Sequence, residues 1–205
     1  MNKGRLFVVS GPSGVGKGTI IEKIMEKLGD SVMLSVSATT REPRTGDVDG
    51  VDYYFLTEEE FVKRVEAGGF LEHAFVHGHY YGTPLDPVME SVEAGRDVIL
   101  EIDVQGAMKV KETYEEGVYI FILPPSIKVL RERLTGRGTE TPQAVEKRMG
   151  KAMGEIGYLD RYDYGIVNDD LDEAVAQLLD IINAEHCRIL GGEAERIISG
   201  YGEEK

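Results

Sequence analysis

Glycines, a lysine and two hydroxyl residues are spaced along residues 11–19 in a way that suits phosphate binding. The stretch reads Gly-Pro-Ser-Gly-Val-Gly-Lys-Gly-Thr and follows the apolar run 6–9. Glycine lets a backbone approach a ligand closely, and the unpaired N–H groups at a helix start favour an anion. Lys17 adds a charge that can reach the β- and γ-phosphates of a nucleotide. The stretch therefore predicts a P-loop for a nucleoside triphosphate, formed by Gly11, Pro12, Ser13, Gly14, Val15, Gly16, Lys17, Gly18 and Thr19.

The alternative is a glycine-rich turn between a strand and a helix that carries a lysine by coincidence. The context that a P-loop requires is present, because an apolar run precedes the loop and an apolar helical face follows it. That face consists of Ile20, Ile21, Ile24, Met25 and Leu28. Gly18 departs from the usual pattern, in which a Ser or Thr hydroxyl after the lysine meets Mg²⁺. Because Thr19 comes one residue later, we expect Mg²⁺ to be held more by phosphate oxygens and water.

A second group of cations and hydroxyl groups follows at residues 35–46. Arg41 and Arg44 flank a proline, whose restricted backbone can hold both guanidinium groups near one site. Paired arginines suit a phosphate, and Tyr53 and Tyr81 can add hydroxyl donors. The alternative, a solvated basic loop with two tyrosines packed beside it, fits these residues equally well when they are taken alone.

Acidic side chains indicate a binding site less clearly than the glycine-rich loop does. Glu101 and Asp103 are two residues apart on a predicted strand, so they face the same side at the end where α/β sheets bind ligands. The alternative for Glu101 is an ion pair with an arginine, and Glu72 alone reads as a surface glutamate. Three nearby histidines lack the ligand spacing of a metal site, so we expect structural or exposed roles for His73, His77 and His79.

Length and composition narrow the function classes. The 205 residues can bury one core with small inserted lobes, and a net charge of −14 argues against nucleic-acid binding. The single Cys187 excludes an internal disulfide, and we expect it to be a buried thiol. No apolar run approaches the ~18 residues of a membrane span, and no signal-peptide pattern is seen. These features favour a cytoplasmic protein that does not act at a membrane.

Apolar runs alternate with helical patterns, which predicts an α/β protein whose parallel sheet is flanked by helices. The expected strands are 6–9, 32–36, 97–102, 118–123 and 165–167. The expected helices between and after them are 86–94, 105–114, 127–134 and 171–190.

Two segments interrupt this alternation. Residues 37–83 are rich in Thr, Tyr, Gly and charge and predict a small inserted lobe, with a helix capped by Thr57 and Glu60. Residues 137–154 predict a lid helix that carries several cations and need not join the core. The resulting division is a core of 1–36, 84–124 and 155–190, a lobe of 37–83, a lid region of 125–154 and a fraying tail of 191–205.

In this order, the motifs resemble those of the guanylate kinase family, over a single unit of residues 4–184. Besides the P-loop, the matching segments are 35–44, 50–55, 79–82, 102–106, 136–141 and 167–171. Each segment is short, but together and in this order they are specific. The resemblance implies a P-loop NTPase core, a GMP-binding lobe and a helical lid, and it implies an enzyme that moves a phosphoryl group from ATP to GMP with Mg²⁺.

The resemblance also implies roles for individual residues. The GMP phosphate would be held by Arg41, Arg44, Tyr53 and Tyr81. The guanine edge would be read by Ser37, Glu72 and Thr83, with Glu101 facing the same nucleotide. Arg137 and Arg148 would embrace the triphosphate of ATP, and Asn168 would lie near the adenine. Asp103 would contact Mg²⁺ through water.

Phosphoryl transfer depends on positioning and charge, so the residues expected to act in catalysis are cations. They are Lys17, Arg41, Arg44, Arg137 and Arg148. Two rival interpretations remain, neither of which needs a different fold. One is an inactive guanylate-kinase-like scaffold module, whose marks would be a degraded P-loop and missing lid arginines. The other is a P-loop kinase for a different phosphorylated acceptor. No obligate protein partner is expected.

Overall fold

The computed structural model describes residues 3–135, 142–189 and 191–201. A five-stranded sheet in the order β2-β7-β1-β8-β9 forms the core, and all of its strand pairs are parallel. Its strands are β1 (Leu6–Ser10), β2 (Val32–Leu34), β7 (Asp97–Glu101), β8 (Val118–Leu123) and β9 (Tyr164–Val167). Because β1 is central and every carboxyl end lies at one edge, the loop after β1 sits in the middle of the ligand-binding edge. The predicted α/β class is confirmed.

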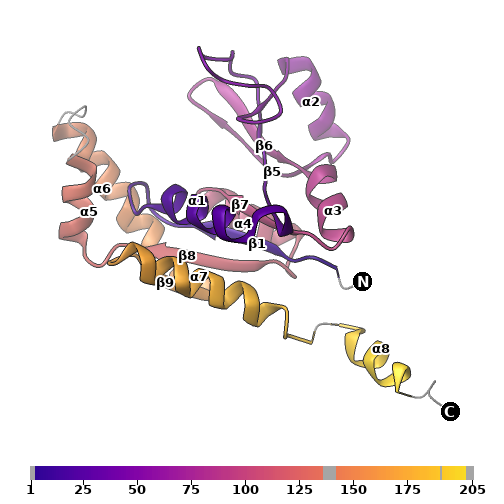
Figure 1. Cartoon of the computed structure of the whole chain (residues 1–205). Coiled ribbons are helices and arrows are strands. Elements are labelled where there is room, and N and C mark those ends of the chain that lie inside the picture. Colours follow the sequence, from indigo (N-terminus) through magenta and orange to yellow (C-terminus); the bar gives the residue numbers. More distant parts are fainter. Residues whose placement is uncertain (1–2, 136–141, 190, 202–205) are drawn as a thin grey trace.

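Helices cover both faces of this sheet (Figure 1). One core cluster joins Phe7 and Val9 to α1 (Lys17–Leu28) and α7 (Leu171–Glu185). The other joins Leu6 and Val8 to α3 (Leu85–Glu93) and α4 (Val104–Thr113). Successive strand residues point to opposite faces, so a run of apolar residues in β1 is what a strand buried on both sides requires.

Residues 38–84 build a second sheet in the order β4-β3-β6-β5, seen at the top of Figure 1. Its strands are β3 (Ala38–Thr39), β4 (Tyr54–Phe55), β5 (Phe70–Val76) and β6 (His79–Pro84), and it carries α2 (Glu58–Glu66). Phe61 of α2 stacks on Phe70 with ring centroids 4.4 Å apart. The predicted cap of this helix is confirmed, because Thr57 Oγ1 accepts a hydrogen bond from the Glu60 N–H at 3.2 Å.

The lid region contains α5 (Ile127–Thr135) and α6 (Pro142–Ile156). The second of these helices joins the core, which its cation-rich sequence did not require, since Val145, Met149 and Ala152 are buried in the core cluster that also contains residues of α1. These residues recur at i, i+4 and i+7, which places them on one face of a helix. An ion pair between Arg131 and Glu146 also joins the two helices.

The structure departs from expectation most at the C-terminal end. The helix α7 ends at Glu185, and the tail that was expected to fray forms α8 (Glu193–Gly200), which projects away from the body in Figure 1. Cys187 is exposed, so its predicted burial is wrong. It lies in the turn after α7, where His186 bonds to Asp97 at 2.7 Å and holds the turn against the sheet. In the described part of the chain, no helix has the length and apolar character needed to cross a membrane.

Candidate active site

The loop between β1 and α1 needs glycine at three positions for two separate reasons. Gly11, Gly14 and Gly16 have φ angles of 142°, 89° and 95°, a region that favours glycine. Space is also lacking, because a Cβ on Gly16 would lie 2.6 Å from the side-chain nitrogen of Asn168. Gly16 is the N-cap of α1 and makes no side-chain cap, so the first N–H groups of the helix face the loop. The loop therefore has the geometry of an anion cradle.

A cavity of about 350 Å³ opens over this loop. Its lining consists of Ser13, Gly14, Gly16, Lys17, Gly18, Thr19, Glu22 and Glu101. The Lys17 ammonium donates to the carbonyl oxygens of Gly11 at 2.7 Å and Pro12 at 3.2 Å. Burial lowers the pKa of Lys17, and the nearby Glu101 carboxylate opposes this shift. The lysine is thus positioned inside the cradle, where phosphate oxygens can replace the carbonyls as acceptors.

Two side chains brace the P-loop from the neighbouring strand and helix. The buried Asn168, just after β9, donates from its side-chain nitrogen to the Val15 carbonyl at 2.7 Å. Arg133 of α5 donates to the Asn168 carbonyl at 2.9 Å and to the Val15 carbonyl at 3.4 Å. Sequence patterns gave no signal for Arg133, which looks like any other charged residue of an amphipathic helix. The predicted contact of Asn168 with ATP stays a prediction.

The lid helix α6 reaches the same loop. The Arg148 guanidinium donates to Ser13 Oγ at 2.5 Å, which places the predicted lid arginine at the P-loop. The other predicted lid arginine, Arg137, lies outside the described residues. One turn further along α6, Lys151 approaches Asp103 at 3.4 Å. The lid thus brings cations toward the edge of the sheet where β1 and β7 end.

In the lobe, Arg41 is held among aromatic rings and an aspartate that sequence patterns did not single out. Its guanidinium donates to Asp47 at 2.8 Å and lies 5.4 Å from the ring centre of Tyr53. Tyr53 in turn meets the ring of Tyr81 edge-on at 6.1 Å. The backbone N–H of Arg44 also donates to Asp47, at 2.9 Å, and together with Arg41 it lowers the pKa of that carboxyl.

These contacts argue against the solvated-loop alternative. The side chain of Arg41 is only 12% exposed, whereas a solvated basic loop would leave it in water. The structure therefore brings Arg41, Tyr53 and Tyr81 together, with Arg44 in the same turn.

Two of the three residues expected to read guanine, Glu72 and Thr83, are in contact. Glu72 of β5 and Thr83 of β6 are cross-strand partners, and Thr83 Oγ1 donates to Glu72 Oε1 at 3.0 Å. Thr83 is fully buried, and burial raises the pKa of Glu72. The second carboxylate oxygen of Glu72 faces Gly106 of α4, where a Cβ would lie 3.4 Å away. Ser37 precedes β3, and its carbonyl accepts from the Tyr54 N–H at 2.9 Å.

Glu101 and Asp103 take different positions. Both Glu101 carboxylate oxygens lie 3.8 Å from where a Cβ on Gly18 would be, so this side chain faces the P-loop cavity. Burial raises its pKa, and Lys17 opposes the shift. Asp103 is the N-cap of α4, with Oδ1 accepting from the Gly106 N–H at 2.9 Å. Within the described ranges, no cluster of three or more His, Cys, Asp or Glu side chains could hold a metal ion.

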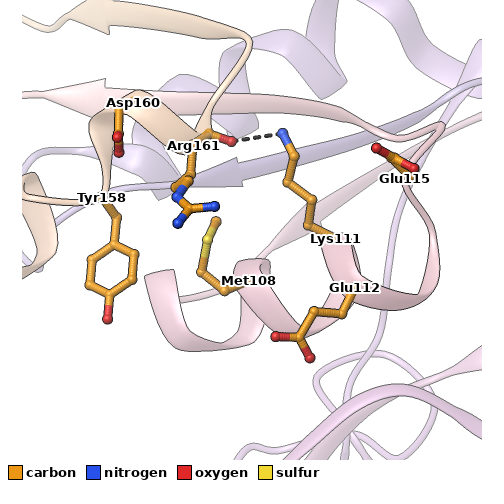
Figure 2. Close-up of a pocket in the computed structure, with 7 residues that line it drawn as sticks. All are labelled: Met108, Lys111, Glu112, Glu115, Tyr158, Asp160 and Arg161. Atoms are coloured by element: carbon orange, nitrogen blue, oxygen red, sulfur yellow. Dashed lines mark hydrogen bonds between the residues drawn. The ribbon is translucent and has the colours of Figure 1, made fainter.

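A separate cavity of about 500 Å³ lies between α4 and the segment after α6 (Figure 2). The Lys111 ammonium donates to the Arg161 carbonyl at 2.7 Å across it, as the dashed line shows. The lining consists of Met108, Lys111, Glu112, Glu115, Tyr158, Asp160 and Arg161. None of these residues was expected to bind either nucleotide, so the candidate site remains at the P-loop and the lobe.

A glycine-lined loop with a lysine, placed between a central parallel strand and a helix, defines a nucleotide-binding protein of the P-loop class. Comparison with known proteins narrows this class. The family model described as guanylate kinase matches residues 3–185. The chain belongs to the guanylate kinase family.

Individual relatives agree with this assignment. A guanylate kinase of Clostridium perfringens (strain SM101 / Type A) is 53% identical over 92% of this chain and 87% of its own length. One of Caldanaerobacter subterraneus subsp. tengcongensis is 53% identical over 91% of this chain and 90% of its own. The crystal structure of guanylate kinase from Anaplasma phagocytophilum superposes with a TM-score of 0.71 at 37% identity, covering 91% and 88% of the two chains.

A solved structure of much lower sequence identity has a similar fold. The SH3-kinase fragment of tight junction protein 3 gives a TM-score of 0.50 at 14% identity, covering 92% of this chain and 60% of that fragment. Identity this low shows the fold alone.

Proposed function

We propose that this protein transfers the γ-phosphoryl group of ATP to GMP and releases ADP and GDP. The observation that carries the choice of acceptor is the Glu72 carboxylate, bonded to the buried Thr83. The lobe that holds this pair also holds Arg41 against Asp47. A guanine nucleotide has a base that a carboxylate can recognise and a phosphate that an arginine can bind, and this lobe offers both groups.

The chemistry of the base supports guanine. An ionised carboxylate only accepts hydrogen bonds, and guanine presents its N1–H and 2-amino group as donors. Adenine has no matching pair of donors on that edge, so the half-buried Glu72 would keep its hydrogen bond from Thr83 but receive none of the bonds that guanine would donate. Leaving a desolvated charge unpaired is costly, and such mismatches allow strong discrimination. Ser37 and Thr83 complete the proposed base site.

The monophosphate of GMP and the triphosphate of ATP would each bind to their own set of residues, facing each other across the site. Arg41, Arg44, Tyr53 and Tyr81 would hold the monophosphate of GMP. The loop 11–19 would hold the triphosphate of ATP, with Lys17 at its β- and γ-phosphates. The lid would add Arg148, already at Ser13, together with Arg137. Asn168 would lie near the adenine and also keep the loop in shape through Val15.

The cations of the chain would then assist the transfer of the phosphoryl group. An oxygen of the GMP phosphate attacks the γ-phosphorus in line, and it needs no general base because it is already ionised at neutral pH. The cations offset the repulsion between the two nucleotides and the charge of the transition state. Closure of the lid and the lobe excludes water, which would otherwise compete as the acceptor.

The P-loop cavity also fits Mg²⁺ bound together with ATP. The ion prefers oxygen ligands and keeps several waters, and it would neutralise phosphate charge when bound. The cavity offers the Glu101 carboxylate and the Thr19 hydroxyl as oxygen donors, whereas no hydroxyl is present at Gly18. Asp103 stays a candidate for contact through water, since its Oδ1 is used by the helix cap.

Observed contacts disfavour both rival interpretations. An inactive scaffold module is disfavoured by the intact P-loop, with Lys17 in place and Arg148 against it. A kinase for another acceptor is disfavoured by the Glu72–Thr83 pair.

A coupled assay that offers GMP, dGMP, AMP, UMP and CMP with ATP would test the proposed function. We expect kcat/KM for GMP to exceed that for AMP by about 10⁴-fold, because the base site is built from hydrogen-bonding groups. Equal or higher activity on AMP or a pyrimidine nucleotide would contradict the choice of acceptor. Absence of activity on all five would favour the scaffold interpretation.

A further inference from the structure

Lys151 lies among acidic side chains beside the P-loop, outside the motifs that carry the family resemblance. Its ammonium is 3.4 Å from Asp103 Oδ2 and 3.3 Å from Glu155 Oε1. Asp103 starts α4 just after β7, at the ligand-binding edge of the sheet. Glu155, Asp103 and Lys151 are all close enough to Lys17 to affect its pKa. Lys151 therefore lies near the place where the γ-phosphate would lie.

Helix geometry puts Lys151 on the side of α6 that faces the site. Successive residues of an α-helix turn by about 100°, so Arg148, Lys151 and Glu155 lie within about 60° of one another. Arg148 contacts Ser13 of the P-loop, which identifies this side of α6 as the one that faces the loop. Lys147 is exposed and lies one turn before Lys151, about 100° around the helix from Arg148, so it is further from the side that contacts the P-loop.

The ion pair between Lys151 and Asp103 is of a kind that can be exchanged. Both side chains are exposed, by 62% and 53%, and such exposed pairs contribute little to stability. The other partner, Glu155, is only 8% exposed and lies one turn further along the same helix. Partial burial lowers the pKa of Lys151, but Glu155 and Asp103 raise it more, so the ammonium stays charged. A lysine is a flexible point charge that binds phosphate well. Two nucleotides that bring several phosphate charges would therefore compete with Asp103 for the ammonium.

We infer that Lys151 is a further phosphate-binding cation of the lid. Its ammonium leaves the exposed Asp103 and binds the phosphoryl group during transfer, while Glu155, on the next turn of α6, keeps the lysine side chain in position. The carboxylates hold the ammonium in place while the nucleotides are absent. This inference rests on the proposed function, because it assigns Lys151 to the same transfer step.

Lys151→Gln tests this role, with Lys147→Gln as the matched control on the same helix. We expect Lys151→Gln to lower kcat at least 10-fold and to leave the KM for GMP within about twofold, since one charge–phosphate contact in the transition state is lost. Lys151→Arg should recover part of kcat, because it keeps the charge. Lys147→Gln should behave as wild type. Affinity for ADP with aluminium fluoride and GMP, a mimic of the group in transfer, should fall more in Lys151→Gln than affinity for ADP alone.

A purely structural role would give a different pattern. If Lys151 only fastens the lid, Lys151→Gln lowers the thermal unfolding temperature while kcat stays within twofold of wild type, and this would overturn the inference. Equal losses of affinity for ADP and for the aluminium fluoride complex would overturn it too. The wild-type assay separates the two levels, because an inactive wild type refutes the proposed function itself.

Discussion

Replacing Lys17 with alanine is expected to lower kcat by about 10³-fold, in line with the loss of a cation that stabilises the transferring phosphoryl group. Lys17 lies inside the cradle, bonded to the Gly11 and Pro12 carbonyls, and alanine removes its charge without disturbing the glycines. In the proposed function GMP binds in the lobe of residues 37–83 and not at the P-loop, so its affinity should change little. Steady-state kinetics and calorimetric titration with GMP measure the two effects separately.

Lys23→Ala is the matched control for this variant. Lys23 is on the same helix, and its ammonium pairs with the exposed Asp172 at 3.2 Å. Its kcat should equal that of wild type. If Lys17→Ala weakened GMP binding as much as it slowed turnover, Lys17 would not be confined to the ATP side and the assignment would fail.

Replacing Glu72 with glutamine should weaken GMP selectively. Glutamine keeps the shape of the side chain but puts an amide donor where guanine needs an acceptor, so kcat/KM for GMP should fall about 10²-fold. The KM for ATP should stay within about twofold. Glu66→Gln, at an exposed position of α2 in the same lobe, should leave both constants unchanged. An unaltered KM for GMP in Glu72→Gln would remove Glu72 from base recognition.

The pH dependence of GMP binding provides a second test of the proposed role of Glu72. Burial raises the pKa of this carboxyl, so it takes up a proton at a higher pH than an exposed glutamate does. In the proposed base site the ionised form accepts the hydrogen bonds of guanine, and GMP affinity should therefore fall as the pH drops through that raised pKa. The GMP phosphate titrates as well, so the informative quantity is the difference between wild type and Glu72→Gln. Identical pH profiles for the two proteins would contradict this role.

Much of the fold could be predicted because its signals are local. The buried strand 118–123 has the bounds expected from its apolar run, and the cap at Thr57 has the partner expected from Glu60 three residues later. The P-loop could be recognised because its glycines and Lys17 are contiguous in the sequence.

The parts of the site that could not be predicted from the sequence depend on contacts that form only in the folded chain. Asp47, Arg133 and Lys151 look like ordinary surface charges, and only the folded chain brings them to Arg41, to Val15 and to Asp103. The cations of α6 concealed its apolar face, and Cys187 is exposed because α7 ends before it.

The most direct test of the central claim is a crystal structure with GMP and a non-hydrolysable ATP analogue bound together. The account predicts the monophosphate beside Arg41 and Arg44, the base at Glu72 and the triphosphate in the loop 11–19 with Lys17. A monophosphate bound away from the two arginines, or a triphosphate outside that loop, would contradict it.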